Sequence, residues 1–246
     1  MKIIPLSEGA FTVSKTKIFF PFDKENDDLQ QRETGSLLVE VQPFVVVTSE
    51  DILLLDAGLG FEKKGMMQIH QNLINAGIDP SKITKVLMSH LHKDHSGGLS
   101  KLNPLTGKRE LTFPQAIHYI QKQEMDFAFE KGFPSYITED FECLKNNNKV
   151  VLLNGDTVID GYVKCEITGA HCPYHQVFWI VDGGEKIFFG GDVAPQLQQM
   201  KSRFVTKYDY DGKKSMELRQ QWWQKGQEEK WSFLFYHDIR TPVFQG

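Results

Sequence analysis

Three histidines and one aspartate lie within six consecutive positions of the segment 89–98, SHLHKDHSGG; they are His90, His92, Asp94 and His95. In extended backbone, side chains two positions apart point the same way, so the first two histidines can bind one cation while a turn directs the other two residues toward a second. Imidazole suits zinc, iron or copper, and a carboxylate suits zinc, iron or manganese. Gly97 and Gly98 permit the close backbone approach that such a turn needs. The segment therefore predicts a metal site rather than a histidine-rich surface loop.

Further residues that can bind a metal follow later in the chain. His171 lies in the run 168–175, Asp192 ends the run 188–192, and His237 lies in the run 235–238. The last two each stand at the end of an apolar stretch. A buried strand that ends in such a residue is a usual source of active-site groups in a sheet-based enzyme.

These four motifs resemble those of the metallo-β-lactamase superfamily of hydrolases. Residues 90–95 fit the family signature H-x-H-x-D-H, and the run 168–175 is similar to the family segment T-P-G-H-T-x-x-H, with Gly169 and Ala170 in place of Pro and Gly. The motifs occur in family order, and the resemblance covers the chain from Gly35 onward. It implies one metal on His90, His92 and His171, a second on Asp94, His95 and His237, and Asp192 as the bridge between them.

The resemblance also implies a mechanism with two divalent cations, zinc first, with manganese or iron as alternatives. Two adjacent cations share a bridging hydroxide, because metal binding lowers the pKa of water to about 7. Asp192 would bridge the metals and set their separation. Asp94 would orient the hydroxide with its free oxygen and carry its proton toward the leaving group. Both aspartates are therefore expected to be catalytic.

Several other polar residues are assigned supporting roles. Asp56 ends the apolar run 52–55 and resembles the family's L-x-D-x-G segment, where it would orient a histidine. His175 is expected to pack behind the metals, and His70 and His118 to be structural. The cysteines, Cys143, Cys165 and Cys172, are odd in number and lack CxxC spacing, which favours free thiols.

Length and composition limit the classes of protein to which this chain can belong. A chain of 246 residues without repeats or linker-like stretches predicts a single domain spanning residues 1–246. A net charge of −4 argues against nucleic-acid binding and so against the RNA-processing branch of the superfamily. The N-terminal stretch does not resemble a secretory signal and no apolar run is long enough to span a membrane, so we expect a cytoplasmic protein. The expected partner is a small-molecule substrate, with neither nucleic acid nor membrane, and a homodimer is allowed.

The hydropathy pattern predicts strands and helices in alternation. A hairpin is expected over 36–55, helices over 62–76, 121–130 and 215–224, and further strands over 83–88, 116–120, 149–153, 162–167, 176–181, 186–189 and 231–236. Two strand-rich halves, each covered by helices, fit the α/β four-layer αββα sandwich that the resemblance implies.

The segment 101–148 is rich in aromatic residues, and two interpretations are open. The favoured one has these residues pack the flank of the domain; in the other, some line an apolar pocket beside the metals. The residues are Phe113, Tyr119, Phe127, Phe129, Phe133, Tyr136 and Phe141.

Within the superfamily, residues 15–36 and 113–114 look like the lactonase and organophosphate-hydrolase branch. Members that open acyl-homoserine lactones carry a tyrosine three residues after the bridging aspartate, whereas this chain has Pro195. We therefore expect hydrolysis of a small activated ester, a strained lactone or a phosphotriester with a hydrophobic portion, weak action on acyl-homoserine lactones and none on β-lactams.

Three alternatives compete with this function. A glyoxalase II-like thioesterase is disfavoured because only nine residues follow His237, which leaves no C-terminal helical domain. A non-hydrolytic iron redox protein on the same scaffold is disfavoured by the full set of seven ligands. The same intact set argues against a binding protein without activity.

Overall fold

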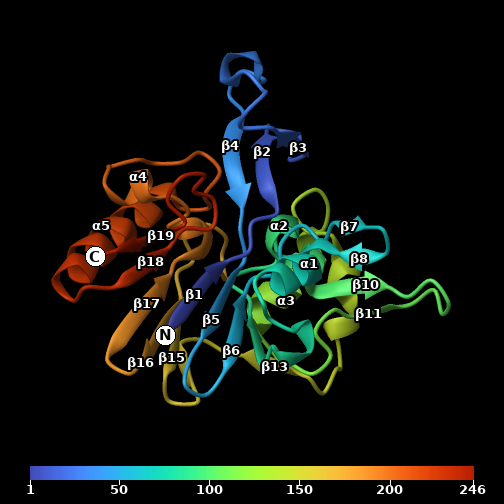
Figure 1. Ribbon diagram of the computed structural model, residues 1–246. Coiled ribbons are helices and arrows are strands. Elements are labelled where there is room, and N and C mark those ends of the chain that lie inside the picture. Colours follow the sequence, from blue (N-terminus) through green and yellow to red (C-terminus); the bar gives the residue numbers. More distant parts are fainter.

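The computed structural model describes residues 1–246 and contains two six-stranded sheets that face each other (Figure 1). In spatial order the first sheet comprises β1 (Lys2–Pro5), β5 (Phe44–Val47), β6 (Ile52–Leu55), β9 (Lys85–Leu87), β12 (Ile117–Gln121) and β13 (Val150–Leu153). The second comprises β14 (Thr157–Ile159), β15 (Val163–Ile167), β16 (Gln176–Asp182), β17 (Glu185–Phe189), β18 (Ser232–Leu234) and β19 (Val243–Gln245).

Helices cover the outer faces of both sheets. On the first sheet lie α1 (Gln68–Asn75) and α3 (Lys122–Lys131), and on the second lie α4 (Leu197–Met200) and α5 (Gly212–Glu228). The short helix α2 (Lys93–Ser96) begins within the histidine-rich segment. Short 3-10 turns occupy Leu29–Gln31, Pro80–Lys82, Gly97–Leu99, Thr138–Asp140, Glu142–Leu144 and Gly191–Val193. No helix combines the length and the apolar character needed to cross a membrane.

The core divides into three clusters because both faces of the central strands are buried. In β6, Leu54 packs toward α1 and α3, whereas Leu53 and Leu55 pack between the sheets. In β16, Phe178 points between the sheets and Trp179 toward α5. This alternation follows from the two-residue period of a strand, and burial on both faces explains the continuous apolar runs of the sequence. The predicted αββα sandwich is confirmed.

A smaller sheet extends from the sandwich. It is formed by β3 (Phe19–Phe22), β2 (Gly9–Val13) and β4 (Leu37–Val41), and we call it the N-terminal arm (Figure 1). The predicted hairpin over 36–55 therefore divides at Pro43: β4 joins the arm, while β5 and β6 form an antiparallel hairpin of the first sheet. Proline cannot donate a ladder hydrogen bond, so it marks the point where the chain changes sheets.

The predicted helix over 62–76 is wrong in its first part. Residues 62–67 form the two-stranded hairpin β7 (Glu62–Lys63) and β8 (Met66–Met67), and α1 begins only at Gln68. Lys64 and Gly65 have φ values of 54° and 77°, and a left-handed pair of this kind makes a tight hairpin turn. The other predicted elements occur with shifted bounds. The strands β1, β2, β3, β14 and β19, the short helices α2 and α4, and the hairpin β10 (Ser100–Leu102) and β11 (Arg109–Leu111) were not predicted.

The two glycines after the histidine-rich segment allow close contact between backbones. A Cβ on Gly98 would lie 2.0 Å from the carbonyl oxygen of Ala57, and one on Gly97 would lie 2.3 Å from that of Leu59. These distances are too short for any side chain. The glycines thus bring the loop after β6 against the turn of α2, as the sequence predicted, and this contact holds Asp56 beside the histidines.

Candidate metal centre

The structure brings all seven sequence-predicted ligands together at one edge of the sandwich. Each lies just after a strand or in the loop that follows it: His90, His92, Asp94 and His95 after β9, His171 after β15, Asp192 after β17 and His237 after β18. Because β6, β9 and β12 run parallel, as do β17 and β18, their carboxyl ends meet at the same edge. The side chains form two groups, each able to hold one cation.

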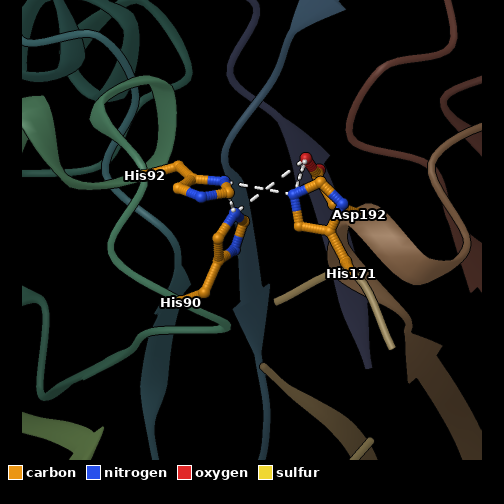
Figure 2. Close-up of side chains that lie close together, drawn as sticks. All are labelled: His90, His92, His171 and Asp192. Carbon is orange, nitrogen blue, oxygen red and sulfur yellow. Dashed lines mark hydrogen bonds and ion pairs between the residues drawn. The ribbon is translucent and has the colours of Figure 1, made fainter. Parts of the chain in front are cut away.

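The first group consists of His90, His92, His171 and Asp192, whose ligand atoms lie within 4.8 Å of one another. Nε2 of His90 lies 2.9 Å from Nδ1 of His92, and Nε2 of His171 lies 3.1 Å from the same nitrogen. Figure 2 shows the three imidazoles turned toward one another beside the carboxylate. Burial holds the pKa of His90 and His92 well below the usual histidine range, which keeps both rings neutral.

The second group consists of Asp94, His95 and His237, all buried. Oδ2 of Asp94 lies 3.6 Å from Nε2 of His95 and 3.5 Å from Nε2 of His237. The hydroxyl of Tyr236 donates a hydrogen bond of 2.6 Å to the carbonyl of Asp94, and its ring stacks on His95 with centroids 4.0 Å apart. These contacts fix both the acid and the imidazole in position.

Asp192 lies between the two groups. Its Oδ1 is 3.0 Å from Nε2 of His95 and 3.0 Å from Nε2 of His237, while its Oδ2 is 3.2 Å from Nε2 of His171. Burial alone would raise the pKa of this carboxyl, but the charges of His237, His95 and His171 hold it well below its usual range. The carboxylate therefore stays ionised and presents one oxygen to each group.

The donor set fits a pair of divalent cations. Nε2 of His95 and Oδ1 of Asp192 are both buried and lie 3.0 Å apart, but their geometry does not make a hydrogen bond, so neither atom has a hydrogen-bond partner. Buried polar atoms without partners are unfavourable unless something else satisfies them. Imidazole without its extra proton and carboxylate are common zinc ligands, and each group supplies at least three. A cation bound here would displace the protons that charge His95, His171 and His237 in its absence.

In His95, His171 and His237, the ring nitrogen that does not face Asp192 also has a hydrogen-bond partner. Asp56 accepts from Nδ1 of His95 at 2.7 Å and from the backbone N–H of Ser89, as expected for its predicted orienting position. Nδ1 of His237 donates to the carbonyl of Glu40 at 2.7 Å. Nδ1 of His171 lies 2.8 Å from Oδ1 of Asp209. Such partners fix the tautomer and the direction of a ligating histidine.

Asp209 was missed by the sequence analysis. It lies in the loop before α5, where the carbonyls of His171 and Ala170 accept hydrogen bonds from the backbone N–H groups of Tyr210 and Asp211 at 3.0 and 2.7 Å. No motif surrounds it, and its position 38 residues after His171 follows no short-range period. The sequence contained no signal that could have singled it out among the other acids.

Replacing Asp209 with alanine should weaken metal binding about 10- to 100-fold. The change removes the carboxylate that orients His171 and raises its basicity, without removing a ligand. Metal affinity would be measured by competition with a chromophoric chelator, with circular dichroism as a check of folding. Asp126→Ala, which alters an exposed carboxylate on α3, is the matched control. Unchanged metal affinity in Asp209→Ala would show that the contact does not orient the histidine.

The remaining histidines and the cysteines lie outside the two groups. His70 is half-buried with Nε2 3.1 Å from the carbonyl of Thr112, and His118 is buried in β12. His175 lies behind the site, where its Nε2 accepts a hydrogen bond of 3.2 Å from the backbone N–H of Asp192. All three cysteines are free thiols, as predicted.

A cavity of about 270 Å³ opens onto the two groups. Its walls come from the N-terminal arm, the start of α2, the segment 195–199 at the start of α4 and the loop 204–209. They include Val13, Phe19, Leu37, Val39, Pro195, Phe204 and Tyr208. None of the aromatic residues of the segment 101–148 lines it. Phe113, Tyr136 and Phe141 belong to the core under the first sheet, and Phe127 and Phe129 pack against it, whereas Phe133 is exposed. The flank-packing interpretation is therefore confirmed for these five residues, and the pocket interpretation is wrong.

A family profile described as "Metallo-beta-lactamase superfamily" matches residues 39–222. The chain belongs to the metallo-β-lactamase superfamily. The predicted family is thus confirmed, and relatives in the superfamily point to its lactonase-like branch. The protein named "N-acyl homoserine lactonase AttM" of Agrobacterium fabrum is 33% identical over 113 residues, which are 42% of this chain and 38% of the relative. A protein of the same name from Rhizobium johnstonii is 30% identical over 54% of this chain and 49% of its own length. The matches span less than half the length of these curated relatives.

Solved structures agree with the superfamily fold. A "probable metal-dependent hydrolase from Staphylococcus aureus" has a TM-score of 0.79 at 24% identity, with 99% of this chain and 91% of that one covered. The structure of AidC, described as a "dizinc quorum-quenching lactonase" with a bound product, has a TM-score of 0.72 at 19% identity over 98% and 88% of the two chains. At these identities the likeness establishes the fold.

Proposed function

We propose that this chain is a dinuclear metal-dependent hydrolase of small esters or lactones, with phosphotriesters as a further substrate class. The observation that carries the proposal is the single carboxylate of Asp192, which faces two separate groups of metal-binding side chains. One group would hold the first cation through His90, His92 and His171. The second cation would be held by Asp94, His95 and His237. Zinc is the first choice for both positions because the set contains five histidines and two aspartates.

When bound, the two cations would supply the activated water expected between them and positive charge for the developing oxyanion. The protein's own residues then have separate tasks. Asp192 bridges the groups, and Asp94 lines the cavity, where its carboxylate can accept a proton and return it to the leaving group. His175 and Asp56 hold Asp192 and His95 in place. We also infer that residues 1–246 act as one domain, because the two halves share a core and each contributes ligands.

The cavity supports a choice among substrates. Pro195 lines it at the position where the acyl-homoserine lactonases carry a tyrosine, so no phenol stands there. Two tyrosines near the candidate motifs in sequence, Tyr174 and Tyr208, could supply a phenol instead. Tyr208 lines the cavity, whereas Tyr174 packs against Phe127 with ring centroids 5.9 Å apart. The names of the curated relatives favour a lactone substrate. We therefore propose lactones and activated esters, with weak action on acyl-homoserine lactones.

A substrate panel should show metal-dependent hydrolysis of aryl esters or strained lactones. The panel would include acyl-homoserine lactones, phosphotriesters, a glutathione thioester and a β-lactam, and elemental analysis would identify the metals in the same preparation. Activity should disappear with a chelator and return when zinc is added. Turnover of the thioester or the β-lactam with kcat/KM above about 10⁴ M⁻¹s⁻¹ would contradict the proposal. Finding only iron, with no hydrolysis in any arm, would favour the redox alternative.

A further inference from the structure

Two lysines line the cavity beside the candidate metal centre and have no part in the hydrolysis proposed above. Lys17 comes from the turn between β2 and β3 of the N-terminal arm, and Lys93 is the first residue of α2. Both side chains are partly buried. The acids that line the same cavity, Asp94, Asp192 and Asp209, each face histidines. Neither ammonium group forms an ion pair within the chain; Asp94 attracts the charge of Lys93 only from a longer distance, and Lys17 repels it.

Ser135 contacts the side chain of Lys17 and the backbone of Lys93. Its hydroxyl accepts a hydrogen bond from Nζ of Lys17, and its carbonyl accepts the backbone N–H of Lys93 at 2.9 Å. Nζ of Lys93 lies 5.8 Å from the ring centroid of Phe19, within the range of a cation–π contact. The two lysines thus line the same cavity from different elements that meet at Ser135.

An unpaired ammonium group that loses water without gaining a counter-charge is unfavourable. A ligand with an anionic group would supply that charge, and the apolar side chains of Val13, Leu37 and Val39 along the same wall would contact its hydrocarbon part. The cavity thus combines two cations with an apolar wall.

We propose that Lys17 and Lys93 form an anion-binding subsite that selects esters or lactones carrying a carboxylate group. This inference rests on the proposed hydrolase function and names its substrate class. It differs from the sequence-based expectation of a hydrophobic substrate portion, which depended on aromatic residues that the structure places elsewhere. Acyl-homoserine lactones are uncharged and would leave the two lysines without a partner.

The test uses two matched esters, the mono-4-nitrophenyl ester of glutaric acid and its neutral methyl ester. With the zinc-loaded protein, kcat/KM should be at least about 10-fold higher for the anionic ester, after subtraction of the uncatalysed rate. The ratio should fall toward one in Lys17→Met combined with Lys93→Met, and salt should lower it in the unaltered protein. Lys17→Arg, which keeps the charge, should keep the preference. Lys15→Met, an exposed lysine of the same turn, is the matched control and should leave the ratio unchanged.

Equal rates for the two esters, or a preference that survives the double replacement, would overturn the subsite. Metal content would be measured in each variant because Lys93 lies between two candidate ligands. If neither ester and no member of the substrate panel is cleaved, the hydrolase proposal fails. Calorimetric binding of the corresponding 4-nitroanilides, charged and neutral, then tests the subsite by itself: tighter binding of the charged one, lost in the double variant, supports it, and equal binding rejects it.

Discussion

Replacing Asp192 with asparagine should remove one of the two metal ions and lower kcat/KM for an activated ester by about 10²-fold or more. The carboxylate presents Oδ1 to His95 and His237 and Oδ2 to His171. An amide carries no net charge, so two cations a few ångströms apart would repel each other without a shared anion. Elemental analysis, ester kinetics and circular dichroism of the purified variant measure metal content, activity and folding separately.

Asp126→Asn is the control for this substitution, because Asp126 pairs with Lys122 on the exposed face of α3. It should keep both metals and full activity. Two metal equivalents and unaltered kinetics in Asp192→Asn would reject the bridging role. Loss of the folded signal would instead show that the buried carboxylate is required for stability.

The unaltered protein should bind two metal equivalents, and His171→Ala and His237→Ala should each lower that number and abolish most activity. The two histidines belong to different groups, so each substitution removes one ligand from one cation. Metal per folded chain would be measured after exhaustive dialysis against buffer containing trace zinc. One equivalent or fewer in the unaltered protein would reject the dinuclear arrangement.

His70→Ala and His118→Ala provide the comparison for these ligand variants. His70 contacts Thr112 and Phe113, and His118 is buried in β12, away from both groups. Both should keep two equivalents even where the substitution lowers stability. A metal lost from His70→Ala would mean that the ligands have been assigned incorrectly.

Sequence reasoning identified those residues of the site that belong to a local sequence pattern. Spacing within residues 90–95 and the polar ends of apolar strands indicate candidate ligands, and the family resemblance adds His171 and divides the set into two groups. The same resemblance predicted that Asp56, at the end of β6, orients a histidine, which agrees with its contact with His95. Asp209 and the backbone carbonyl of Glu40 could not be found this way. Their contacts with His171 and His237 depend on how loops from distant segments pack, and a carbonyl has no sequence signature.

The layers of the fold were also predictable, since strands buried on both faces read as continuous apolar runs. The division of β4 from β5 and the hairpin at 62–67 were not, because each depends on local backbone turns that compete with the periodicity of the flanking residues. One wall of the cavity comes from the N-terminal arm, which contacts the site only through tertiary packing. Substrate selection was therefore the part of the function least accessible from sequence.

The candidate ligands are divided between the two halves of the sandwich, and this division links metal binding to folding. His92 and His171 are 79 positions apart and lie after strands of different sheets. The unfolded chain cannot bring them together, so cations that bind here favour the folded state. A ligand at about 100 times its dissociation constant adds about 2.7 kcal/mol to the free energy of unfolding. Bound metal would thus act as a non-covalent cross-link between the sheets, and the thermal stability of the protein would depend on the metal available to it.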